Sequence, residues 1–267
     1  MKSTLTIVFI FSVLFCVAQN HTPSAAGAKG LALGNTNTTT QDAQSLFGNQ
    51  AGLAFLEETS FTAFGENRFF IAELNQFSAG VAIPVKNGTF GLAVQYFGFE
   101  DYNEQKIGIA YGRKLFDKVA IGIQIDYLNL RVPFYGNQGN ITAEIGLQLP
   151  INDKFLIGVH VFSPFTIAWS EEDFVPTILA TGITYQPSEK LSITAEVEKD
   201  IDFPVDFKFG IDYKIVEMLS LRVGANTYPV QNSFGLGLNL KNLNIDVAMV
   251  YHQILGLTTG FSATFRL

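Results

Sequence analysis

From about residue 58 to the last residue, apolar and polar positions alternate along the chain with a period of two. Successive side chains of a strand point to opposite faces, so each such segment has one apolar and one polar face. In one of them the apolar row is Val205, Phe207, Phe209, Ile211 and Tyr213. The pattern predicts about fourteen strands, which begin near Phe61, Phe70, Thr89, Gln105, Lys118, Asn140, Lys154, Pro176, Lys190, Val205, Leu219, Ser233, Asn244 and Leu257.

A soluble sandwich and a membrane barrel both produce this alternation, so the period alone does not choose between them. Two features of the rows favour the barrel. The polar rows contain many small residues, such as Gly146 and Gly210, which suit a crowded lumen. The apolar rows are rich in Phe, Tyr, Ile and Leu, as expected of a lipid-facing band. We therefore expect an all-β fold, a transmembrane antiparallel β-barrel of about 14 strands.

The connections between the predicted strands give a third reason. Tight turns such as Lys86-Asn87-Gly88 and Asn152-Asp153 interleave with longer segments at residues 100–104, 131–139, 163–175, 200–204 and 228–232. Barrels of the bacterial outer membrane have short periplasmic turns, longer external loops and an even number of strands. A closed barrel also leaves no unpaired strand edge facing lipid.

Composition and charge exclude several other classes. Hydrophobic residues make up 48% of the 267 residues and charged residues 15%, which argues against disorder and against a coiled coil. The 17 Lys and Arg residues face 24 Asp and Glu residues, so a nucleic-acid partner is not expected.

The first eighteen residues have the pattern of a signal peptide. Lys2 precedes an apolar run at residues 5–17, and Cys16-Val17-Ala18 resembles a cleavage site. We expect cleavage after Ala18, which removes the one cysteine. Together with the predicted barrel, a cleaved signal peptide implies export to the outer membrane of a Gram-negative bacterium. The expected organisation is a signal peptide at 1–18, an N-terminal plug segment at 19–57 and the barrel at 58–267.

Motifs between the signal peptide and the first strand resemble a known family. Residues 27–34, then Asp42-Ala43-Gln44-Ser45, then Asn49-Gln50-Ala51-Gly52-Leu53 resemble the opening of the long-chain fatty-acid transporter (FadL-like) superfamily of outer-membrane barrels. They are most similar to its PorV/PorQ-like branch, which is associated with type IX secretion. The resemblance implies a fourteen-stranded barrel with the N-terminal segment folded inside as a plug, with Asp42, Ser45, Asn49 and Gly52 in the plug.

The residues themselves agree with a plug. Residues 35–50 are too polar for a lipid-facing strand and too poor in charge for a solvated tail, although an ordinary periplasmic tail is the alternative. Charged side chains on the predicted lumen face could hydrogen-bond the backbone of the plug. These are Glu144, Glu196, Asp206, Lys208, Arg222 and Asp246.

Candidate chemistry is sparse. The chain has three His residues, and neither His160 nor His252 has a partner at the spacing that zinc sites favour. No serine is placed to form a Ser–His pair with His252, and the Glu171-Glu172-Asp173 triplet is more typical of solvated loop acids than of a cation site. We expect no cofactor, no metal and no enzymatic activity.

The long connection at residues 163–175 is the most informative external segment. It carries Phe165, Ile167, Trp169 and Phe174. Apolar side chains on an exposed loop need a cover, which could be lipid headgroups, the barrel mouth or a partner protein. An aromatic belt at the outer membrane interface is the plainer alternative.

Two functions follow from these features. The first is a non-catalytic accessory subunit that binds another outer-membrane or secreted protein, in protein secretion or outer-membrane biogenesis. The second is a FadL-like conduit for hydrophobic small molecules, and a purely structural barrel in contact with outer-membrane lipids is a third possibility. The short connections leave little chain to build a ligand pocket, so the sequence favours the accessory subunit.

Overall fold

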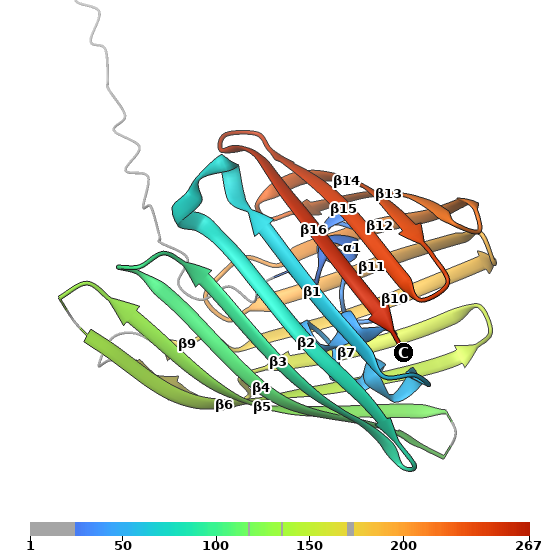
Figure 1. Cartoon of the computed structure of the whole chain (residues 1–267), viewed down its shortest axis with the longest axis horizontal. Coiled ribbons are helices and arrows are strands. Elements are labelled where there is room, and N and C mark those ends of the chain that lie inside the picture. Colours follow the sequence, from blue (N-terminus) through green and yellow to red (C-terminus); the bar gives the residue numbers. More distant parts are fainter. Residues whose placement is uncertain (1–24, 117, 135, 170–173) are drawn as a thin grey trace, which may run out of the picture.

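The chain forms one closed antiparallel barrel of fourteen strands (Figure 1). The computed structural model describes residues 25–116, 118–134, 136–169 and 174–267. The barrel strands are β1 (Ser60–Asn67), β2 (Asn75–Val85), β3 (Gly88–Gly98), β4 (Asn103–Leu115), β5 (Val119–Val132), β6 (Gly136–Asn152), β7 (Phe155–Phe162), β10 (Ile178–Ser188), β11 (Leu191–Asp200), β12 (Asp206–Val216), β13 (Leu219–Thr227), β14 (Val230–Asn239), β15 (Leu243–His252) and β16 (Gly256–Arg266). The predicted fold class is confirmed.

The barrel closes where its first and last strands meet. Ser60 of β1 pairs with Arg266 of β16, and the pairing runs without a register shift to Asn67 opposite Thr259. Each strand therefore has a hydrogen-bonded neighbour on both sides, which satisfies the backbone without water. We call the end with the tight turns the turn side and the opposite end the loop side.

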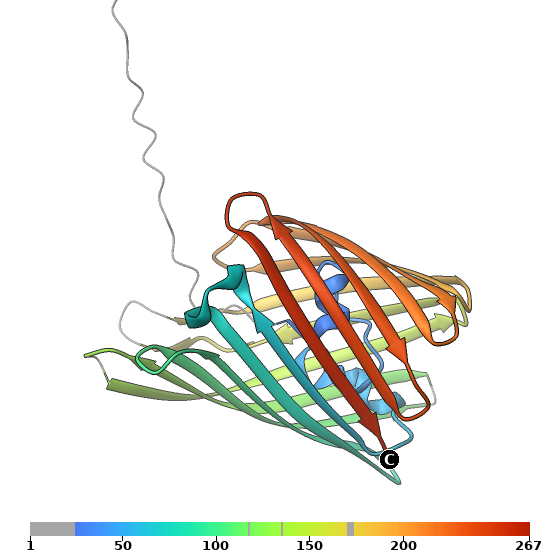
Figure 2. The same cartoon turned by 45° about the horizontal axis from the view of Figure 1, so that its top comes forward.

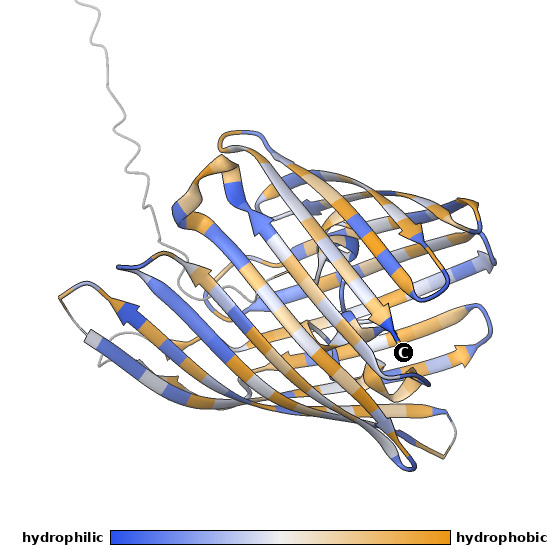
Figure 3. Ribbon diagram, viewed as in Figure 1, coloured by the Kyte–Doolittle hydropathy of each residue, from blue (hydrophilic) through white to orange (hydrophobic). Residues whose placement is uncertain are grey.

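The outer surface of the barrel is apolar. Along every barrel strand, apolar residues alternate with small or polar ones (Figure 3). Large apolar side chains such as Phe77, Ile109, Phe209 and Phe234 point outward and are exposed. Exposed apolar patches of this extent are not found on soluble monomers, and the band matches the lipid-facing surface of a transmembrane barrel.

Two predicted boundaries are wrong. The strand predicted to begin near Phe70 begins at Asn75, because residues 68–74 form the short 3-10 helices η3 (Arg68–Phe70) and η4 (Ala72–Leu74). Phe69 and Phe70 have positive φ angles of 57° and 58°, which an extended strand does not allow. The loop predicted at residues 131–139 is mostly strand, since β5 and β6 continue past their neighbours on the loop side (Figure 1).

Residues 25–56, which we call the lumen segment, lie inside the barrel (Figure 2). The segment contains α1 (Ala28–Ala32) and the 3-10 helices η1 (Ala43–Phe47) and η2 (Gln50–Phe55). The predicted signal peptide, and residues 19–24 of the predicted plug, lie outside the described residues. Within residues 25–267, apart from the short gaps, no helix is long and apolar enough to cross a membrane.

The inner wall makes room for the lumen segment with glycines. At eleven positions on eleven different strands, a Cβ atom would overlap an atom of the lumen segment. A larger residue at these positions would have to displace either the backbone of the segment or one of its side chains, such as that of Leu46. These positions are Gly80, Gly91, Gly112, Gly122, Gly146, Gly158, Gly182, Gly210, Gly224, Gly235 and Gly260.

Candidate functional site

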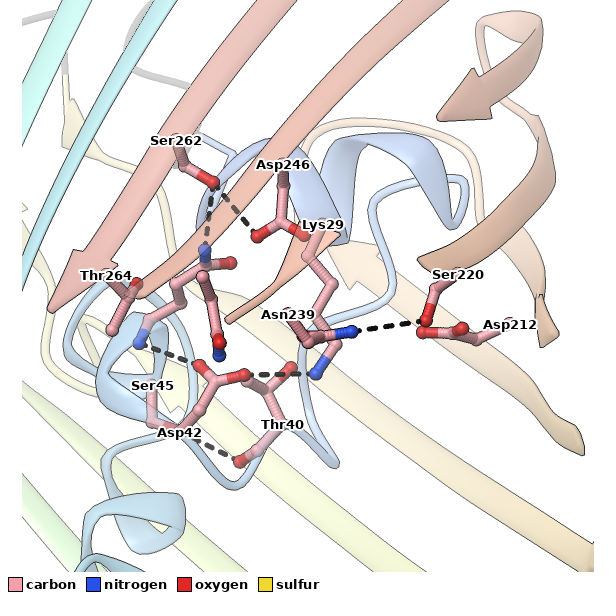
Figure 4. Close-up of polar contacts among 12 residues, drawn as sticks. Lys29, Thr40, Asp42, Ser45, Asp212, Ser220, Asn239, Asp246, Ser262 and Thr264 are labelled. Carbon is pink, nitrogen blue, oxygen red and sulfur yellow. Dashed lines mark hydrogen bonds and ion pairs between the residues drawn. The ribbon is translucent and has the colours of Figure 1, made fainter. Parts of the chain in front are cut away.

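The lumen segment is folded by its own polar side chains. Asp42 caps η1 by accepting a hydrogen bond from the backbone N–H of Gln44 (2.8 Å), and its carboxylate forms an ion pair with Lys29 (3.0 Å; Figure 4). Ser45 donates its hydroxyl to the carbonyl of Thr40 (2.9 Å), as Figure 4 also shows. These contacts fold residues 40–47 into a compact loop, and its Leu46 and Phe47 are buried in an apolar cluster with Leu53 and with wall residues such as Ala93.

Lys29 and Asp42 each stabilise the charged form of the other. The negative charge of Asp42 is the main cause that raises the pKa of Lys29. Burial acts to raise the pKa of Asp42, but the ammonium of Lys29 and the hydrogen bonds that the carboxylate accepts outweigh burial and lower it. Both groups are therefore charged over the physiological pH range.

Asn49 and Gly52 join the segment to the wall and to itself. Asn49 caps η2 through Ala51, and its Nδ2 donates to the carbonyls of Thr38 (2.6 Å) and of Leu147 on β6 (3.1 Å). A Cβ at Gly52 would overlap the carbonyl oxygen of Thr40, so a glycine is required for this close approach. The four residues that the sequence assigned to the plug thus all make internal or wall contacts of the lumen segment.

Glu196 on β11 binds the lumen segment at Asn37 and Thr38. Its Oε2 atom accepts three hydrogen bonds, from the backbone N–H groups of Asn37 (2.8 Å) and Thr38 (2.9 Å) and from the Thr38 hydroxyl (2.8 Å). From β6, three strands from β11 in the barrel order, Gln148 donates to the carbonyl of Thr38 (3.0 Å). The Thr39 hydroxyl lies 2.7 Å from that of Thr184 on β10. Three strands therefore fix residues 37–39.

The other predicted lumen residues have different partners. Glu144 binds Lys106 (2.7 Å), His160 (2.9 Å) and the side chain of Gln50 (2.7 Å), so it meets the segment through a side chain rather than the backbone. Arg222 pairs with Asp212 and Asp246, and Lys208 pairs with Glu198. Asp206 accepts from Thr227 and Tyr228 at the adjoining loop.

Within the described part of the chain, Glu196 is the one of the six predicted lumen residues that forms hydrogen bonds with the backbone of the lumen segment.

Neutral side chains that the sequence did not single out supply the remaining anchors. Ser233 on β14 accepts from the N–H of Gly34 and donates to the carbonyl of Ala32, both at 3.0 Å. Ser262 on β16 accepts from the side chain of Gln44 (3.0 Å; Figure 4). The alternation of the sequence predicts that both serines face the lumen, but it does not distinguish them from other lumen-facing hydroxyls.

Two cavities lie on either side of the lumen segment. The loop-side cavity has a volume of about 280 Å³ and reaches Phe69, Tyr228 and Leu255 near the loops. The turn-side cavity has a volume of about 710 Å³ and reaches Asn152 and Lys190 at the tight turns.

Residues 35–40, which we call the septum, separate the two cavities. Asn35, Asn37 and Thr38 line the loop-side cavity, whereas Thr36, Thr39 and Thr40 line the turn-side cavity. The septum is non-helical and contains a turn in which the N–H of Thr40 donates to the carbonyl of Asn37 (3.2 Å). The flanking helical parts of the lumen segment form the rest of the partition between the two cavities.

The segment at residues 163–175 splits between the barrel mouth and solvent. Trp169, only 7% exposed, packs with Phe162, Ile178 and other apolar residues at the mouth. Phe165 and Phe174 remain 65% and 51% exposed, and Ile167 packs against the edge of the cluster. The structure thus brings Trp169 and Ile167 to the mouth and leaves the two phenylalanines uncovered.

The described residues contain no group of three or more His, Cys, Asp or Glu side chains that could hold a metal. His252 accepts hydrogen bonds at Nδ1 from the N–H groups of Ile254 and Leu255 (both 3.1 Å), which places it in a turn. The Glu171-Glu172-Asp173 triplet lies outside the described residues.

Comparisons with known proteins identify the fold. No protein-family model and no curated protein sequence matches the chain. Among solved structures it is similar to the Ralstonia pickettii toluene transporter TbuX (TM-score 0.72, 12% identity, 90% of this chain and 98% of the other). It is also similar to the Pseudomonas putida toluene transporter TodX (0.70, 12%, 90% and 97%) and to a Pseudomonas aeruginosa FadL homologue (0.67, 11%, 90% and 98%). At these identities the likeness establishes the shared barrel fold.

Proposed function

We propose that the chain is a non-catalytic channel of the Gram-negative outer membrane, through which small molecules with an apolar part pass by way of the lumen. The shared fold supports this, because TbuX and TodX are toluene transporters. In such barrels the tight turns face the periplasm, so the loop-side cavity would face the cell exterior.

The observation that carries the proposal is the pair of cavities with a thin septum between them. The short connections in the sequence suggested that there is no room for a ligand pocket. The lumen itself provides this room, about 280 Å³ in the loop-side cavity and about 710 Å³ in the turn-side cavity. Ligand sites of small molecules have volumes of roughly 300–1,000 Å³. The accessory-subunit interpretation rested on the PorV/PorQ-like resemblance and on short connections that left little chain to build such a pocket.

Passage through the lumen requires the septum to move. Residues 37–39 are held mainly by hydrogen bonds rather than by apolar packing, from Glu196, Gln148 and Thr184. A typical hydrogen bond contributes about 0.5–1.5 kcal/mol net, and one to a charged group about 1.5–3 kcal/mol. Release of a few such bonds costs far less than unfolding the barrel, so local displacement of the septum is the opening step we propose.

A disulfide across the septum tests the channel. The hydroxyls of Thr39 and Thr184 are 2.7 Å apart, so Thr39→Cys with Thr184→Cys would place two sulfurs within bonding reach. In cells that make the oxidised double variant we expect chain-dependent uptake of radiolabelled toluene and of 2-phenylethanol to fall at least fivefold, and to recover with a reductant. Each single variant is the matched control. If cells with and without the protein take up both probes equally, the channel is rejected.

The exposed rings of Phe165 and Phe174 favour a second candidate function, the PorV/PorQ-like accessory subunit of a secretion or biogenesis assembly. An apolar surface at a loop tip is typical of a protein interface. Affinity isolation of the protein in mild detergent distinguishes the two functions. Recovery with a stoichiometric partner that is lost in the Phe165→Ser, Phe174→Ser variant would support the subunit, and recovery of the free barrel would refute it.

A further inference from the structure

The loop-side cavity is lined by more negative than positive side chains. Five carboxylates line it, against three cationic side chains. The carboxylates are Glu66, Glu144, Glu196, Glu198 and Asp206, and the cations are Arg68, Lys106 and Lys208. The cavity as a whole is therefore anionic.

Each of these cations is already paired. Arg68 contacts Glu66 (2.9 Å), Lys106 contacts Glu144 (2.7 Å) and Lys208 contacts Glu198 (2.6 Å). Among the lining residues that the structure describes, no cationic side chain is left to receive an anionic ligand. An incoming carboxylate would have to break one of these pairs, at a considerable cost in a site shielded from water.

Among the described residues that line the cavity, the fully buried side-chain atoms without a hydrogen-bond partner are all acceptors. Glu66 is buried, with its side chain 5% exposed, and its Oε2 atom has no hydrogen-bond partner in the described structure. The Oδ1 atoms of Asn35 and Asn37, on the septum, likewise have none. These atoms have almost no accessible surface, so they contribute negative potential to the cavity wall and do not themselves contact a ligand.

An apolar wall stands beside the carboxylates. Phe162 on β7 and Ile178 and Ala180 on β10 line the same cavity. Ala180 pairs directly with Glu198 across the β10–β11 ladder. Apolar surface and carboxylates are thus neighbours, and one small molecule can contact both.

The exposed residues on the loop side add to the negative field. Glu73, Glu100, Asp101 and Asp202 are exposed there, against Arg131 and Lys199. A rim of one sign raises the local concentration of molecules of the opposite sign.

We propose that the ligand of the loop-side cavity is a small cationic amphiphile, an ammonium group on a compact apolar body. The ammonium is bound by the carboxylates, Glu198 foremost, because it is the more accessible of the acids around Lys208 and Lys208 contacts its Oε2 atom, which leaves Oε1 to accept from the ligand without breaking the pair. The apolar body packs on Phe162 and Ile178. This assignment of a ligand class rests on the proposed channel, but its test measures binding and not transport.

The chain carries its own reporter for that test. Trp169 is the one tryptophan and packs in the same cluster as Phe162 and Ile178. Its fluorescence can be titrated in the purified full-length protein with three phenylalkyl probes of similar size and different charge at pH 7. These are phenethylamine, 2-phenylethanol and 3-phenylpropionate, which carry charges of +1, 0 and −1.

We expect phenethylamine to bind at least tenfold more tightly than the other two probes, with an affinity that falls as salt is added. Glu198→Gln should weaken phenethylamine binding about tenfold, as expected for loss of one charged hydrogen bond, and leave 2-phenylethanol unchanged. Glu217→Gln, in an exposed turn at the other end of the barrel, is the control and should change neither. Equal binding of all three probes, or a preference for the anion, overturns the assignment.

The outcomes separate this inference from the proposed channel. If cells take up toluene through the protein but the protein binds no amine preferentially, the ligand class is wrong and the channel stands. If the purified protein binds phenethylamine selectively but mediates no uptake, the ligand class stands as a binding site and the channel is wrong.

Discussion

Replacing Glu196 by alanine should loosen the septum without unfolding the barrel. In the native protein the Glu196 carboxylate accepts from the backbone of both Asn37 and Thr38 and from the Thr38 hydroxyl. Alanine would leave two backbone N–H groups without their acceptor, at about 1–3 kcal/mol each when buried. Asn37 lines the loop-side cavity, where water can replace part of the loss, so we take about 2 kcal/mol in total.

A loss of about 2 kcal/mol corresponds to a roughly 30-fold rise in the population with a displaced septum, at 1.4 kcal/mol per factor of ten. Hydrogen–deuterium exchange followed by mass spectrometry reads this population from a peptide that covers the septum. We expect its exchange to quicken by about that factor, while peptides from β4 and β5 exchange as before. Glu196→Gln keeps an uncharged acceptor and should give an intermediate rate.

Glu217→Ala is the control for the loss of a surface carboxylate, because Glu217 lies in an exposed turn away from the septum. If septum exchange is the same in the Glu196→Ala and wild-type proteins, Glu196 does not hold the septum. If the whole barrel exchanges faster, the residue supports the barrel wall instead.

Further predictions concern the fit of the lumen segment. Gly146→Val would push against Asn49, so we expect faster exchange of residues 48–52, whereas Gly65→Val, on β1 where a Cβ would make only ordinary contacts, should leave this exchange unchanged. Asp42→Ala loses a helix cap and an ion pair, which together contribute about 1–2 kcal/mol, and should speed exchange of η1. Protection of that helix in the wild type should be level between about pH 4 and pH 10. The lowered pKa of Asp42 keeps its contribution until the pH falls below the usual Asp range, and the raised pKa of Lys29 keeps its contribution until the pH exceeds 10.5. Trp169 should emit at short wavelength and resist acrylamide quenching, and strong quenching would place it in water.

The barrel was predictable from sequence because strand parity is a local property. An apolar residue at every second position faces lipid whichever strand follows, so the rows around Phe209 or Phe234 needed no knowledge of their partners. The predicted strand start near Phe70 failed for the opposite reason. The turn at Phe69 depends on a distant strand, since its N–H donates to the hydroxyl of Thr258 (3.4 Å).

The contacts of the lumen segment were only partly predictable. Charged residues on a lumen face stand out, and Glu196 was found in this way. Ser233, Gln148 and Ser262 look like any other polar residue of their rows, and only the path of residues 25–56 selects them. The sequence shows that the polar rows contain many glycines. It does not show which atom of the lumen segment lies against each one, because that depends on how the segment packs.

The eleven glycines restrict how the lumen can be cleared. Each one lies against a different atom of residues 31–51, so the inner wall and the lumen segment are complementary in shape at eleven places. The lumen segment cannot slide along the barrel axis as a rigid body, because these atoms would leave the space at the glycines and clash with neighbouring side chains of the wall. Within the septum, Thr38 meets two of these glycines, Gly158 on β7 and Gly182 on β10, whereas β11, which carries Glu196, has none of the eleven. A hinged displacement of the septum away from β7 and β10, rather than expulsion of the whole segment, is therefore the motion that this barrel permits.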